Sequence, residues 1–256
     1  MGQIDKSNKR LTTSEDFISE KKISDIIYGF YQLHSHFDGK DTYCFKKDVT
    51  YAKIQEYFKT NAAEPENRKA PVSDRTLTRI NKLLLESGFI QKTKKNGKAV
   101  FILPNTTDFV WVKYETLRFL VNACTPGCIK TYAYLKRWFQ YKQSRKEEFW
   151  FTKKELLSVL GLYSSVSPDY TKINDILNTL TNNGLIEIEL RYFKGENGQP
   201  VPNYVLKDVH EDFIHNKNIY HPNHNKSKIA DIEMPIALDI DINKPIAPFD
   251  FESFNF

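Results

Sequence analysis

Cationic and hydrogen-bonding side chains gather in one short stretch of the sequence, between residues 73 and 98. With 100° per residue and Ile80 turned toward a core, four of them project from the outer face of a helix: Arg75, Thr78, Arg79 and Lys82. Four lysines follow around an Asn-Gly turn: Lys92, Lys94, Lys95 and Lys98. Polar residues face solvent on any helix, but this concentration on two consecutive elements is typical of contact with phosphates and base edges. The stretch therefore predicts a DNA-binding surface.

The second half of the sequence repeats the apolar pattern of the first at an offset of 96 residues. The aligned positions are Leu77 with Ile173, Ile80 with Ile176, Leu84 with Leu180, and Gly88-Phe89-Ile90 with Gly184-Leu185-Ile186. Apolar helical spacing is common, so the hairpin patterns that follow both segments strengthen the case for an internal repeat.

The outer face of the second half differs in charge. Its predicted DNA-binding residues are Thr171, Lys172, Asn178, Arg191 and Lys194. Asp175, Glu187 and Glu189 lie among them, and a carboxylate repels phosphate although it can accept a bond from cytosine N4. Basic residues concentrate instead on the preceding long helix, at Lys130, Lys136, Arg137, Lys142, Arg145 and Lys146. Two interpretations stay open for this half, weak contact with DNA and formation of a homodimer.

Hydrophobic periodicity supplies the elements that position these residues. In residues 21–104 we expect a helix with Ile23, Ile26, Ile27, Phe30 and Phe37 on one face. A short strand at 43–45, a helix over 50–59, a helix from Ser73 to Gly88 and a hairpin over 89–103 follow. In residues 109–207 we expect a helix begun by Thr125-Pro126, a strand at 149–151 and a short helix opened by the capping box of Thr152 and Glu155. A helix from Ser167 to Gly184 and a hairpin over 185–206, turning near 195–198, complete this unit. The order is that of a winged helix, so the predicted fold is α+β, helix-rich, with two tandem winged-helix domains.

The ends of the sequence differ from the body. Residues 1–20 are polar and are expected to be flexible, and residues 208–256 read as a largely irregular tail. Residues 1–230 hold 36 Lys and Arg against 26 Asp and Glu, a net charge of +10, whereas residues 231–256 hold one Lys against six acids, a net charge of −5. A basic body favours an anionic partner, here double-stranded DNA.

Four phenylalanines close the tail among acidic residues: Phe249, Phe251, Phe254 and Phe256. Leaving them exposed is costly, so they are predicted to bind a partner. Three occupants stay open: a groove of another protein, the basic domains of the same chain, and the surface of the same chain or of a twin subunit.

No apolar run approaches the roughly 18 residues of a membrane helix, and Met1 to Arg10 lack the apolar core of a signal peptide. Three cysteines are too few for a disulfide framework. These features predict a cytoplasmic protein, associated with the nucleoid or an episome and not with a membrane.

Signals for enzymatic chemistry are weak. His34 and His36 could suggest a metal-binding pair, but helical spacing turns their side chains about 200° apart. Cys124 and Cys128 with the downstream histidines form no Cys-x-x-Cys pair and bracket a helix start. The sequence has no G-x-S-x-G, Walker or Rossmann motif. We therefore expect no catalytic residues, no metal and no cofactor.

Five runs of the sequence carry a resemblance to known proteins: Val112–Leu120, Cys128–Leu135, Phe151–Leu157, Ile173–Leu177 and Gly184–Ile186. Together they resemble replication and regulatory proteins of plasmids and phages from low-GC Gram-positive bacteria. The resemblance covers about 109–190, with a weaker echo in 73–103. It implies winged-helix initiators that bind origin repeats and recruit host replication proteins, an interaction for which the tail is a candidate. A transcriptional repressor or partition adaptor would use the same chemistry. A winged-helix module that binds only protein is the alternative from another class.

Overall fold

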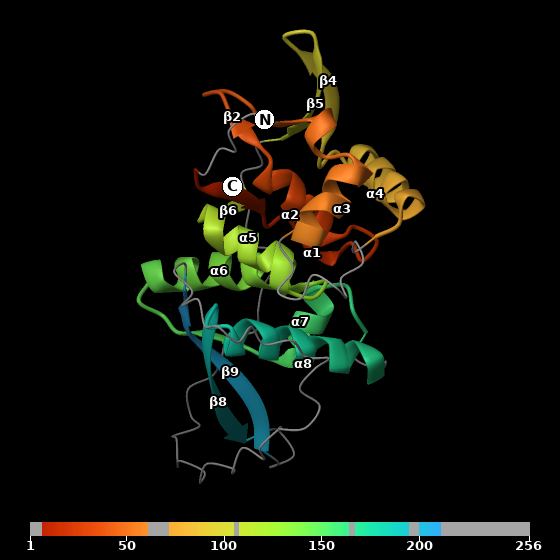
Figure 1. The fold of residues 1–256 in the computed structure, drawn as a ribbon. Coiled ribbons are helices and arrows are strands. Elements are labelled where there is room, and N and C mark those ends of the chain that lie inside the picture. Colours follow the sequence, from red (N-terminus) through yellow and green to blue (C-terminus); the bar gives the residue numbers. More distant parts are fainter. Residues whose placement is uncertain (1–6, 61–71, 105–107, 164–166, 195–199, 211–256) are drawn as a thin grey trace.

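The computed structural model describes residues 7–60, 72–104, 108–163, 167–194 and 200–210 (Figure 1). The elements of the first half are β1 (Lys9–Thr12), α1 (Glu15–Ser19), α2 (Asp25–Leu33), β2 (His36–Phe37), β3 (Thr42–Phe45), η1 (Lys46–Asp48), α3 (Tyr51–Thr60), α4 (Asp74–Glu86), β4 (Gln91–Lys95) and β5 (Lys98–Leu103). Those of the second half are β6 (Phe109–Val112), α5 (Tyr114–Ala123), α6 (Cys128–Ser144), β7 (Phe149–Phe151), α7 (Lys153–Val159), α8 (Ser167–Asn182), β8 (Ile186–Lys194) and β9 (Pro200–Val209).

The two halves share one order of elements. Each has a strand, two helices, a strand, two helices and a hairpin, with β2 as an addition to the first half. The strand between the second and third helices pairs with the last hairpin strand in both halves, giving the orders β2-β3-β5-β4 and β7-β9-β8. With the β1–β6 pair, the described residues form three sheets, all antiparallel. The predicted α+β class is confirmed, and the two hairpins extend from opposite ends of the molecule (Figure 1).

The N-terminal segment is more ordered than we predicted. Within the supposedly flexible residues 1–20, β1 pairs with β6 and α1 buries Phe17 and Ile18. Leu11 of β1 is buried, and the Lys9 Nζ donates to the carbonyl of Ser35 (2.8 Å). The first unit therefore begins near residue 9 rather than residue 21. The prediction was wrong because β1 is stabilised by a strand about 100 residues later, which local polarity does not reveal.

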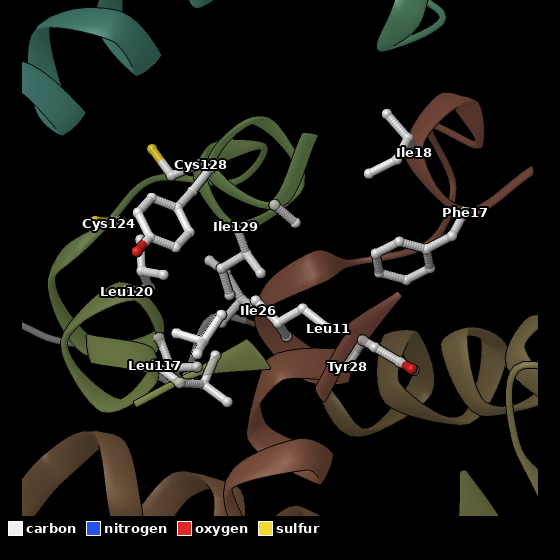
Figure 2. Close-up of a cluster of buried hydrophobic side chains, with 14 of the residues drawn as sticks. Leu11, Phe17, Ile18, Ile26, Tyr28, Leu117, Leu120, Cys124, Cys128 and Ile129 are labelled. Atoms are coloured by element: carbon white, nitrogen blue, oxygen red, sulfur yellow. The ribbon is translucent and has the colours of Figure 1, made fainter. Parts of the chain in front are cut away.

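The core is continuous between the two halves. Figure 2 shows Leu11, Ile26, Leu117 and Ile129 converging from β1, α2, α5 and α6. Gly29 permits this approach, because a Cβ at that position would lie 2.7 Å from the Ile129 Cδ1. Such a contact is closer than side chains tolerate, so any larger residue at this position would force the Ile129 side chain, and the Val121 side chain beside it, to move.

A carboxylate from the first half caps a helix of the second. Thr125-Pro126 was predicted to begin the long helix, but α6 begins after Gly127, which has a φ of 99°. Its free N–H groups are satisfied by the buried Asp25 of α2, whose Oδ2 accepts from the backbone N–H of Gly127 (2.9 Å), Ile129 (3.1 Å) and Lys130 (3.4 Å). A negative charge at a helix N-terminus is favourable. Asp25 thus connects the two halves by hydrogen bonds.

Other local predictions are confirmed. The strand at 43–45, the helix over 50–59, the hairpin over 89–103 and the capping box of Thr152 and Glu155 all form. The helix predicted to carry Ile23 to Phe37 on one face is shorter than expected. It is α2, which begins after the Ser24 N-cap and ends at Leu33, so Ile23 precedes it and Phe37 lies in β2 with its side chain 52% exposed. The turn expected near 195–198 lies outside the described residues. No helix in the described parts of the chain is long and apolar enough to cross a membrane.

Candidate nucleic-acid interface

Helix α4 begins and packs as its sequence predicts. The Ser73 Oγ accepts from the backbone N–H of Thr76 (3.2 Å), and Leu77, Ile80 and Leu84 are buried. This arrangement fixes which face of the helix meets solvent. The predicted outer residues are all exposed: Arg75, Thr78, Arg79 and Lys82.

The charges on that face are largely uncompensated. Lys82 pairs with Glu86 across one helical turn (3.6 Å), an exposed contact of small energy. Among the described residues, no carboxylate lies within ion-pair distance of Arg75 or Arg79. Two guanidinium groups one turn apart are therefore presented to solvent, with the donor geometry that matches phosphate or guanine.

Tyr31 of α2 fixes α4 relative to the hairpin. Its hydroxyl donates to the Asn81 Oδ1 of α4, and its ring stacks on Phe101 of β5 with centroids 5.9 Å apart and planes at 9°. Burial raises the pKa of Tyr31, so the phenol stays neutral and keeps its donor role. One buried side chain thus holds both elements of the candidate interface.

The β4–β5 hairpin divides its lysines between two faces. Lys92 is paired with Phe101 in the ladder, and Lys94 with Ala99. Paired residues share a face, so Lys92 and Lys94 lie on the side of the sheet that packs on α2. The helix α4 lies on this same side of the sheet. Both lysines are exposed.

Lys95 and Lys98 lie on the other face. Their ammonium groups lie over the rings of Tyr43 (4.3 Å) and Phe45 (5.9 Å) of β3. Lys95 also pairs with Asp38 and, at 3.7 Å, with Asp41. The eight predicted residues are therefore exposed or half-buried, but they do not form one continuous surface. Six of them, Arg75, Thr78, Arg79, Lys82, Lys92 and Lys94, belong to the side of α4.

In the second half, Thr171, Lys172 and Asn178 are exposed on α8, and Lys194 is exposed at the end of β8. Arg191 is engaged elsewhere, since it pairs with Glu189 (2.7 Å) and Glu148 (3.1 Å) and its guanidinium lies 4.9 Å from the centroid of the Trp150 ring.

Lys207 joins the same ion-pair network, binding Glu189 (2.8 Å) and Glu148 (3.4 Å). Hydrogen bonds from Arg191, then from Lys207, lower the pKa of Glu189 to about 2. The network neutralises the charge of Arg191, which the sequence predicted to contact DNA. Glu148 lies 43 residues away from Arg191 in the chain, so the local sequence does not indicate this ion pair. Counting α8 and its hairpin, residues 167–209 hold four Lys and Arg against six acids, whereas residues 73–103 hold seven against two.

Two lysines of the basic set on α6 are not surface residues. Lys130 is 5% exposed and donates to the carbonyl of Glu20 (2.7 Å), and Lys136 is 2% exposed and donates to the carbonyl of Trp111 (2.5 Å). Burial lowers the pKa of Lys130 to about 8. Lys130 and Asp25 connect the two halves of the chain, whereas Lys136 joins α6 to β6 within the second half. The spacing of these residues in the sequence did not indicate either role.

Among the described residues, no three His, Cys, Asp or Glu side chains form a group that could hold a metal ion. Cys44, Cys124 and Cys128 are buried and form no disulfide. Of the downstream histidines only His210 is described, and the others lie outside the described residues. His34 caps the end of α2, and burial lowers its pKa to about 4. Phe249, Phe251, Phe254 and Phe256 lie outside the described residues.

Comparison of the chain with protein-family models, with curated proteins and with solved structures found no match. The functional interpretation therefore depends on the geometry and charge of the chain itself.

Proposed function

We propose that the chain binds double-stranded DNA, with α4 and the helical face of the β4–β5 hairpin as its main contact surface. The observation that carries this proposal is that Arg75 and Arg79 are exposed and form no ion pair with any described residue, while Lys92 and Lys94 lie on the same side of the sheet. A helix of this kind can place its guanidinium groups in the major groove, while lysines of an adjoining hairpin contact phosphates.

The order of elements supports the assignment of two winged-helix domains. In each half a helix, a strand, two helices and a hairpin follow one another, and the strand pairs with the second hairpin strand. In that interpretation α4 and α8 are the recognition helices. The difference in charge assigns the dominant electrostatic contact to the first domain, and leaves α8, with Thr171, Lys172 and Asn178, to a weaker contact or to a homodimer.

The biological role we propose is replication initiation on a plasmid or phage, because of the resemblance of residues 109–190 to such proteins. Selection of bound fragments from genomic and episomal DNA tests this role. Iterated repeats beside a replication gene would support it. Enrichment of promoter operators or of partition sites would replace it with repression or partition, without affecting the proposed DNA-binding surface.

The surface itself is tested by the salt dependence of binding to random duplex DNA. Each phosphate neutralised contributes about −0.9 to the slope of log affinity against log salt. Replacing Lys92 and Lys94 together with Gln should flatten the slope by about two units. The control replaces Arg118 and Arg137 with Gln, which also removes two charges; both are 45% exposed, on α5 and α6, and are already paired with acids. Equal flattening in both variants, or no measurable binding by the wild type, would contradict the proposal.

A further inference from the structure

An exposed aromatic cluster surrounds one arginine on the outer face of the β1–β6 sheet. The Arg10 guanidinium lies 4.7 Å from the ring centroids of both Phe109 and Trp111, and 5.7 Å from that of Phe37. Trp111 is 46% exposed and Phe37 is 52% exposed. We call these four residues the Arg10 patch.

The strand register explains why the patch faces outward. Arg10 pairs with Trp111 and Thr12 with Phe109, so Arg10, Trp111 and Phe109 share one face of the two-stranded sheet. Leu11 and Val110 lie on the other face and are buried in the core. The alternation of buried and outward-facing residues along the two strands therefore leaves two large aromatic rings, those of Phe109 and Trp111, on the solvent side of the sheet.

The composition of the patch is that of an interaction site. Trp and Arg are among the residues most enriched at the energetic centres of protein interfaces, and Phe is enriched in interfaces generally. Exposed clusters of such residues mark interaction sites. The β1–β6 sheet and α4 lie on opposite sides of the molecule in the view of Figure 1. An occupant of the patch would accordingly leave α4 uncovered.

The end of this chain has the matching chemistry. Its last nine residues, Pro248-Phe249-Asp250-Phe251-Glu252-Ser253-Phe254-Asn255-Phe256, contain four phenylalanines and two acids. Phenylalanine edges favour contact with the faces of other aromatic rings. Carboxylates favour an arginine, whose planar fork recognises them in pairs of hydrogen bonds.

The last described residue and the patch are both held by side chains of α6. The Tyr132 hydroxyl of α6 donates to the carbonyl of His210, the last described residue (3.0 Å). Four residues further along α6, about 6 Å by helical rise, the Lys136 Nζ holds the carbonyl of Trp111 (2.5 Å). Residues 211–247 can span up to about 120 Å when extended. The tether is therefore long enough for residues 248–256 to reach the patch of their own chain.

We propose that residues 248–256 dock on the Arg10 patch of the same chain, with phenylalanines against Trp111 and Phe37 and carboxylates toward Arg10. Tethering raises the local concentration of the segment to roughly the millimolar range, so modest affinity is sufficient for docking. Because the patch lies away from α4, docking does not depend on the proposed DNA-binding function and does not compete with it.

Photo-cross-linking of the full chain tests the proposal. Trp111 is replaced with p-benzoylphenylalanine, and linked peptides are identified by mass spectrometry after irradiation. The matched control replaces Tyr163, which is 65% exposed in the loop that follows α7. We expect a link between position 111 and residues 248–256 in a species of monomer mass, and no such link from position 163. Adding Arg10→Gln should lower the yield several-fold, whereas Arg137→Gln should not.

Three results would overturn the inference. One is the absence of any link from position 111 to residues 248–256 in a variant whose circular dichroism matches that of the wild type. Another is an equal yield from position 163. The third is a link found only in a species of dimer mass, which would show that the occupant is the tail of a second copy.

Discussion

Asp25 is the residue whose removal should most weaken the connection between the two halves. Asp25→Ala deletes a carboxylate that is 2% exposed and that accepts three backbone N–H bonds from the start of α6. It also removes the carboxylate whose charge most favours the protonated form of the buried Lys130. The first change leaves buried backbone N–H groups without acceptors, and the second leaves the Lys130 ammonium with the carbonyl of Glu20 but with less opposing charge.

The expected cost follows from these contacts. A hydrogen bond to a charged group contributes about 1.5–3 kcal/mol, and three bonds to one oxygen are not additive. Breaking a buried charge interaction by removing one partner costs about 3–5 kcal/mol. We therefore expect the free energy of unfolding to fall by about 3–5 kcal/mol in Asp25→Ala. In Asp25→Asn the loss should be about 1–2 kcal/mol, since the amide oxygen still accepts but the charge at the helix N-terminus is gone.

Urea unfolding followed by circular dichroism measures both losses at pH 7. The control is Glu115→Ala, which removes an acid from the first turn of α5 whose partner is the exposed Arg118 (3.3 Å). Its effect should stay within about 1 kcal/mol. A loss of less than about 1 kcal/mol in Asp25→Ala, or an equal loss in Glu115→Ala, would refute the reasoning.

Three further predictions concern stability. Burial lowers the pKa of Lys130 in the folded chain to about 8, from 10.5. Above pH 8 the unfolded chain therefore binds more protons at this lysine than the folded chain does. The free energy of unfolding should rise between pH 8 and 10 for this reason, by about 1.4 kcal/mol per pH unit at most. The Lys130→Met variant should not show this rise. Equal slopes of unfolding free energy against pH in the wild type and the variant, measured by urea titration, would contradict the prediction. Gly161→Ala should lower the melting temperature by several degrees, since its Cβ would lie 2.3 Å from the Ser19 carbonyl oxygen; an unchanged value would show that α1 and α7 can separate without cost. Tyr31→Phe removes the bond to Asn81 and should cost about 1 kcal/mol, while Tyr163→Phe, at an exposed site, should cost nothing measurable.

Local patterns in the sequence sufficed for the elements that carry the candidate interface. The cap at Ser73, the buried stripe of α4 and the Asn96-Gly97 turn depend on residues within one element or one hairpin. Such features follow from periodicity and turn geometry alone, so the exposed face of Arg75 and Arg79 could be predicted.

What the sequence did not reveal depends on contacts between distant segments. β1 forms because β6 pairs with it, and α6 begins at Gly127 because Asp25 approaches from α2. Lys136 was predicted to lie at the surface because lysine is rarely buried. Its side chain is buried instead, and its ammonium group donates to the backbone carbonyl of Trp111. Arg191 was predicted to contact DNA from its place on the second hairpin, and the sequence did not indicate its ion pair with Glu148, 43 residues earlier in the chain.

The most direct test of the proposed DNA surface is chemical acetylation of lysines, read by mass spectrometry with and without saturating duplex DNA. All five lysines concerned, Lys82, Lys92, Lys94, Lys172 and Lys194, are exposed in the absence of a partner. If α4 and its hairpin contact the duplex, Lys82, Lys92 and Lys94 become protected, and more strongly than Lys172 and Lys194. Protection of Lys172 and Lys194 while Lys92 and Lys94 stay reactive would contradict the account, because the main contact would then lie on α8 and its hairpin.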